Sequence, residues 1–95
     1  MQYPTSMQMG NRSIAVNVVD EPIVVTGRGN RDGNYVGMFN NKASTMTIMD
    51  GEALVHETIE AADVIYDLKL PHQTIQTLAV AMHQAFASGN VAFTQ

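Results

Sequence analysis

The spacing of apolar residues changes once along the chain and divides the sequence into a strand-forming part and a helix-forming part. After Arg12, residues 13–19 (SIAVNVV) alternate with the two-residue period of a β-strand. Further apolar, β-branched or aromatic runs follow, separated by short turn-forming stretches. These runs lie at 22–27 (PIVVTG), 35–39 (YVGMF) and 44–49 (STMTIM). The pattern predicts an antiparallel β-meander of about four strands.

After Asp50 the apolar residues recur with a helical period. With about 100° between successive residues, one side of the helix is apolar and the opposite side carries acidic groups. Asp50 is a suitable N-cap, and Pro71 prevents the helix from continuing past the preceding residue. We therefore predict a helix from about residue 52 to Lys69. The alternative is that residues 52–58 form a fifth strand, paired through a turn at Asp50 and Gly51.

A second helical pattern covers residues 72–88, and Gly89 with Asn90 provides a carboxyl cap. Its apolar stripe consists of Ile75, Leu78, Ala79, Met82 and Phe86. Residues 91–94 predict a short C-terminal edge strand, and the polar residues 1–11 indicate a loosely held, flexible arm. Strands followed by helices indicate an α+β fold, with both helices packed on one face of the sheet and a single domain over residues 12–95.

Composition excludes several classes of protein. The chain has 95 residues, no cysteine and a formal net charge of −4. The lack of cysteine excludes disulfides and thiolate metal sites. The negative charge argues against binding to nucleic-acid phosphates, so we expect no direct contact with nucleic acid. No run is long and apolar enough for a leader or a membrane span, which favours a cytoplasmic protein without membrane contact.

The stretch TGRGNRDGNY at 26–35 concentrates glycine and arginine in a chain with only five Lys and Arg residues. It matches neither a Walker A motif nor a dinucleotide fingerprint, because no Lys-Ser or Lys-Thr follows and no helix begins there. Two guanidinium groups beside a turn backbone still suit carboxylate or phosphate oxygens. The candidate ligand-binding residues are Arg28, Gly29, Asn30, Arg31 and Gly33. The alternative is a solvated hairpin loop.

The segment HETIE, residues 56–60, is similar to the helical zinc motif in which two histidines four residues apart flank a glutamate. Glu60 stands where that motif has its second histidine, and His72 and His83 lie in another segment with no pattern that brings them to His56. A solvated acidic helix face accounts better for these residues. We therefore predict no metal and no cofactor, and without a nucleophile motif we expect no enzymatic activity.

Two charge asymmetries carry the functional prediction. Six acidic residues and no Lys or Arg lie between Asp50 and Asp67, and no charged residue follows Lys69. An acidic helix face suits a basic partner, with improved solubility as the alternative. Interface centres are depleted in charge, so the second helix is expected to contact another subunit; the alternative is a helix sandwiched between the first helix and the sheet. The predicted partner-binding residues are Glu52, His56, Glu60, Asp63 and Asp67, and the predicted oligomer interface comprises Gln73, Thr77, Val80 and Gln84.

These features predict a small non-enzymatic interaction protein of the accessory or inhibitor type, a class that includes viral proteins. We expect a homo-oligomer that presents the acidic helix face and the basic Gly/Arg loop to a protein partner. The alternative is a homo-oligomer that sequesters a phosphate-bearing ligand, such as a nucleotide, through Arg28 and Arg31. A nucleotide panel separates the two, because a bound ligand raises thermal stability.

Overall fold

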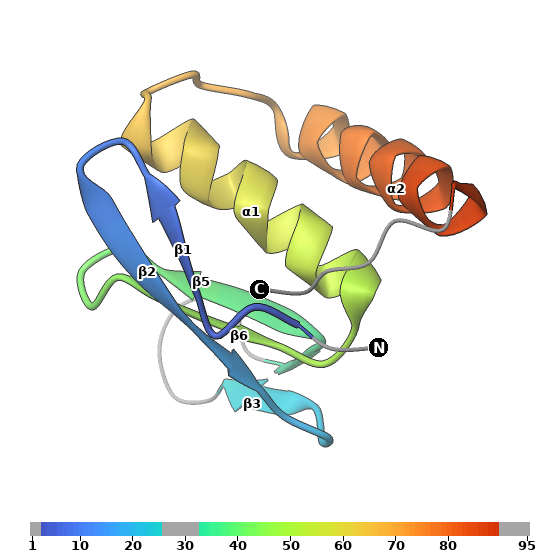
Figure 1. Cartoon of the computed structure of the whole chain (residues 1–95), viewed down its shortest axis with the longest axis horizontal. Coiled ribbons are helices and arrows are strands. Elements are labelled where there is room, and N and C mark those ends of the chain that lie inside the picture. The colour runs from blue at the N-terminus through green and yellow to red at the C-terminus, as the bar shows by residue number, and fades with distance from the viewer. Residues whose placement is uncertain (1–2, 26–32, 90–95) are drawn as a thin grey trace.

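The computed structural model describes residues 3–25 and 33–89 and shows strands followed by helices (Figure 1). The elements are β1 (Ser6–Met9), β2 (Arg12–Val18), β3 (Ile23–Val25), β4 (Gly33–Tyr35), β5 (Gly37–Asn40), β6 (Thr45–Ile48), α1 (Gly51–Ile65) and α2 (His72–Ser88). This arrangement confirms the predicted α+β class. Over the described residues, neither helix has the length and apolar character needed to cross a membrane.

The main sheet has the strand order β1-β2-β6-β5, which differs from a meander. The outer pairs β1–β2 and β5–β6 are antiparallel, but β2 and β6 run parallel, with Val16 opposite Met46. β3 and β4 form a separate antiparallel ribbon in which Val25 pairs with Gly33. The predicted antiparallel meander was therefore wrong. Apolar runs identify strands, but they do not determine which strands pair.

The hydrophobic core lies between the main sheet and α1. Seven buried side chains from β2, β6 and α1 form it, namely Ile14, Val16, Met46, Ile48, Ala53, Leu54 and Ala61. The buried residues of β2 and β6 are two positions apart, so each strand turns one face to α1 and the other face outward. The two-residue period of residues 13–19 therefore predicted the buried face of β2 at Ile14 and Val16, although Val18 in the same register is 51% exposed.

The prediction of a flexible arm was wrong for Ser6–Met9, because these residues form β1 in the main sheet. The turn between β1 and β2 contains Gly10, whose φ of 60° lies in the left-handed region that favours glycine. Met7 and Met9 pack against the core. The apolar face of β1 is thus made of methionines, and the polar residues between them face outward.

α1 begins where the sequence predicted and excludes a strand over residues 52–58. The side chain of Asp50 accepts a hydrogen bond of 2.8 Å from the amide of Ala53, as an N-cap does. The helix ends at Ile65, which is earlier than predicted. Asp67 follows the C-cap Tyr66 with a left-handed φ of 53°, which is incompatible with continued helix, and Lys69 lies in the connection beyond with a φ of 58°.

α2 has the predicted bounds, but it packs less extensively than predicted. Only Ile75 and Ala79 of its apolar stripe are buried, whereas Leu78 and Met82 are 42% and 39% exposed. α1 contacts β5 and β6, and α2 packs mainly on α1, beside which it lies in Figure 1. The edge strand predicted for residues 91–94 lies outside the described residues.

Candidate functional site

A groove of about 820 Å³ lies where α1, α2 and the segment of residues 35–39 meet. Its volume is in the range of small-ligand sites. Positions 52, 56 and 60 of α1 recur at intervals of four and so share one helix face, which lines the groove. The groove is therefore built from the acidic face that the sequence predicted, with β5 opposite and α2 along one side.

The groove is acidic. Four carboxylates line it, those of Asp50, Glu52, Glu57 and Glu60. None of the described residues that line it is Lys or Arg. Carboxylates that line one groove give it a negative potential, which favours the entry of a cation. The groove therefore attracts cationic groups and disfavours anionic ones.

The structure brings together three of the five predicted partner-binding residues, namely Glu52, His56 and Glu60. The other two do not line the groove. Asp63 accepts a hydrogen bond of 2.8 Å from the amide of Leu70 and so stabilises the connection after α1. Asp67 lies beyond the end of α1, with a φ of 53°. The sequence placed Asp67 on the helix face because the helix was predicted to continue to Lys69.

Glu57 is a groove residue that the sequence analysis missed. It is only 7% exposed, and it lies under α1 where the helix faces β5. A Cβ atom added at Gly37 would stand 3.0 Å from Cγ of Glu57 and 3.1 Å from Cβ of Ala53. The missing side chain at Gly37 thus allows α1 to approach the strand. A glycine within a strand pattern is a sequence signal of such close approach.

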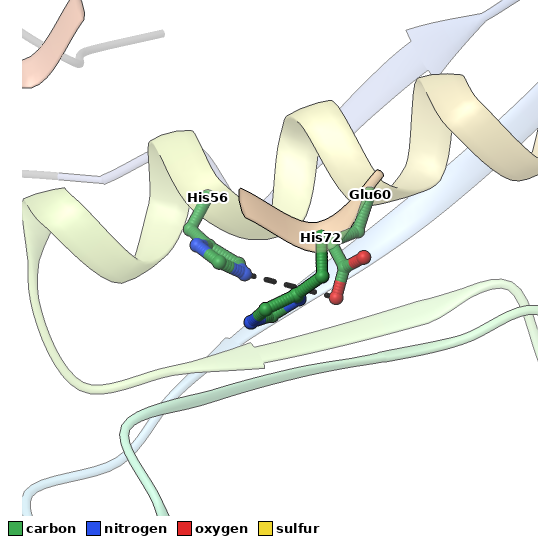
Figure 2. Close-up of side chains that lie close together, drawn as sticks. All are labelled: His56, Glu60 and His72. Atoms are coloured by element: carbon green, nitrogen blue, oxygen red, sulfur yellow. Dashed lines mark ion pairs between the residues drawn. The ribbon is translucent and has the colours of Figure 1, made fainter. Parts of the chain in front are cut away.

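His72 joins His56 and Glu60 across the junction of α1 and α2 (Figure 2). Nε2 of His56 lies 3.7 Å from Oε2 of Glu60. The rings of His56 and His72 have centroids 5.8 Å apart and an angle of 62° between their planes. One donor atom from each of the three residues lies within 4.8 Å of the others. We call these three residues the histidine cluster.

The expectation that His72 would not approach His56 was wrong. The connection after α1 turns the chain back, so that α2 begins beside the middle of α1 rather than beyond its end (Figure 1). Asp67 and Lys69 contribute to this turn with their left-handed backbone. Neither residue is a glycine, so the sequence carried no clear sign of the reversal.

The four predicted interface residues of α2 are exposed and line a shallow groove of about 620 Å³ along the helix. They are Gln73, Thr77, Val80 and Gln84. Over the described residues, α2 buries only Ile75 and Ala79, so it is not sandwiched between α1 and the sheet. That alternative is therefore wrong.

Most of the predicted ligand-binding loop lies outside the described residues, namely Arg28, Gly29, Asn30 and Arg31. Gly33 is the first residue of β4 and pairs with Val25 of β3. Residues 26–32 therefore join two paired antiparallel strands, as the hairpin alternative requires. Binding of a ligand by this loop stays a prediction.

Comparison with protein-family models, curated proteins and solved structures gives no match for this chain. What the chain binds must be inferred from the chemistry of the groove, the histidine cluster and the exposed side of α2.

Proposed function

We propose that this chain is a small non-enzymatic interaction protein that binds a basic segment of a protein partner in the acidic groove. One observation carries the proposal: four carboxylates line a single groove that has no Lys or Arg among its described lining residues. Complementary charge speeds association and selects partners. Because cysteine is absent, a reducing compartment suits the chain, and we expect this interaction in the cytoplasm.

The mixed surface of the groove favours a peptide segment over a phosphate-bearing ligand. Val36 and Met38, which are 55% and 39% exposed, offer apolar surface beside the carboxylates. Lysine and arginine combine an apolar stem with a cationic head, so their side chains match both parts of this surface. The carboxylates would repel a phosphate. The nucleotide alternative would therefore have to use Arg28 and Arg31, outside the described residues.

Self-association through α2 is the second part of the proposal. The helix contains no Asp, Glu, Lys or Arg. Three of its large apolar side chains are more than one-third exposed, namely Leu78 at 42%, Val80 at 47% and Met82 at 39%. Removing apolar surface from water contributes about 25 cal/mol per Å². Val80 lies on the side of α2 that carries the other predicted interface residues, whereas Leu78 and Met82 face nearly the opposite way. A second copy that covers the side around Val80 would bury apolar surface, and no charged group on α2 would have to be desolvated.

A labelled peptide of about ten Lys, Arg and Leu residues is a suitable probe of the groove, with binding followed by fluorescence anisotropy. The double variant Asp50→Asn/Glu52→Gln removes two groove charges and keeps an N-cap residue. Each exposed charge pair contributes about 0.2–1 kcal/mol, so the loss of two should weaken binding by roughly two- to thirtyfold.

The matched control is Asp20→Asn/Glu21→Gln, which removes two exposed charges that do not line the groove. At 0.15 M salt the Debye length is about 8 Å, so distant charges have little influence, and the control should bind like the wild type. Equal weakening by both double variants would show unspecific attraction and contradict the proposal. Absence of peptide binding by the wild type at low salt would contradict it as well.

A further inference from the structure

We propose that the histidine cluster is a binding site for a divalent transition-metal ion of the zinc type. The ion would be held by His56 and Glu60 of α1 and by His72 at the start of α2 (Figure 2). It would connect two helices whose ligands lie in different segments of the chain. The site lies in the same groove and shares Glu60 with the proposed peptide site. Its test uses zinc without peptide, so either proposal can fail without the other.

The distances suit a metal ion after a small adjustment. In a tetrahedral zinc site the ligand bonds are about 2.0–2.1 Å, which puts two ligand atoms about 3.3–3.4 Å apart. Nε2 of His56 and Oε2 of Glu60 already lie 3.7 Å apart. All three donor atoms lie within 4.8 Å of one another. Because the side chain of His72 is exposed, it can rotate to bring its ring nitrogen closer.

The donor atoms favour zinc-type ions over Mg²⁺ and Ca²⁺. Two imidazoles and one carboxylate form a frequent three-ligand set for zinc, whereas Mg²⁺ and Ca²⁺ prefer oxygen ligands. His56 and Glu60 are half-buried on the same face of α1, one helical turn apart, so a short segment presents two ligands together.

The electrostatic surroundings also favour a dication. Three further carboxylates line the same groove, those of Asp50, Glu52 and Glu57. Their negative potential raises the local concentration of cations. Three protein ligands leave a fourth tetrahedral position, which a water molecule can occupy. We therefore infer a three-ligand site, open at one position toward the groove.

Calorimetric titration of the tag-free, EDTA-treated full chain with ZnCl₂ tests the site. We expect one ion per chain. Loss of an outer-shell group around a metal weakens binding by about 10- to 100-fold, so the loss of a direct ligand in His72→Ala should weaken it at least tenfold. His83→Ala is the matched control, because His83 lies on the same helix and is not a member of the cluster. It should bind zinc like the wild type.

Thermal unfolding gives a second readout that separates metal binding from a structural effect of the variant. Zinc at about one hundred times its dissociation constant should raise the melting temperature of the wild type by roughly ten degrees or more. The shift should vanish in His72→Ala, whose melting temperature without metal should match that of the wild type. Equal zinc affinity of His72→Ala and wild type, no zinc binding at all, or one ion per two chains would each overturn the proposal.

Discussion

At the scale of single residues, Gly37 controls how closely α1 approaches β5. An added Cβ at this position would stand 3.0 Å from Cγ of Glu57 and 3.1 Å from Cβ of Ala53. The side chain of Glu57 is buried at this contact, and the Cβ of Ala53 moves only with the helix backbone. Close packing of α1 on β5 therefore depends on the absence of a side chain at Gly37.

The substitution Gly37→Val should destabilise the fold. Its branched side chain would overpack the contact between α1 and β5, and overpacking typically costs about 1–3 kcal/mol of unfolding free energy. Urea unfolding followed by circular dichroism measures this loss. Met38→Val is the control, because Met38 is 39% exposed on the same strand and surface substitutions usually change stability by less than about 0.5 kcal/mol. Equal stability of Gly37→Val and wild type would show that this contact is not tight.

At the scale of elements, helix bounds were more predictable than strand pairing. The N-cap of α1 at Asp50 and the start of α2 after Pro71 depend on residues within one turn, so the local sequence contains them. The end of α1 was the exception, because the helix stops at Ile65 and not at Lys69. The parallel pairing of β2 with β6 depends instead on contacts between distant segments. Residues 22–27 were recognised as a strand, yet Ile23–Val25 pair with β4 in a separate ribbon. Strand pattern alone does not distinguish these partners.

The N-cap of α1 provides a prediction at this scale. Asp50→Ala removes the acceptor of the 2.8 Å hydrogen bond from the amide of Ala53 and leaves that donor without its capping partner. Loss of an N-cap costs about 1 kcal/mol of unfolding free energy. Asp50→Asn keeps a capping oxygen, so its stability should stay close to that of the wild type. Chemical denaturation of both variants measures the difference, and equal losses would indicate that the charge of Asp50 matters more than its hydrogen bond.

At the scale of the whole molecule, the sequence predicted which residues are chemically distinctive but not where they meet. The helical spacing of polar residues in α1 predicted that Glu52, His56 and Glu60 share one face of the helix. It did not indicate that α2 and β5 would enclose these residues in a groove, or that His72 would join them. Both outcomes depend on the direction of the connection between the helices, where non-glycine residues adopt left-handed backbone.

α2 contains no Asp, Glu, Lys or Arg, and its packing on α1 leaves most of its residues exposed. Self-association through α2 is the prediction that follows for the whole molecule. Sedimentation at tens of micromolar should show an oligomer of the wild type. Ala81→Glu places a carboxylate in the shallow groove of α2, where like charges from two copies would repel, so the oligomer should dissociate at least about tenfold more readily. Ala43→Glu adds the same charge at an exposed turn and should leave the assembly unchanged. A wild type that is strictly monomeric under these conditions would refute self-association through α2.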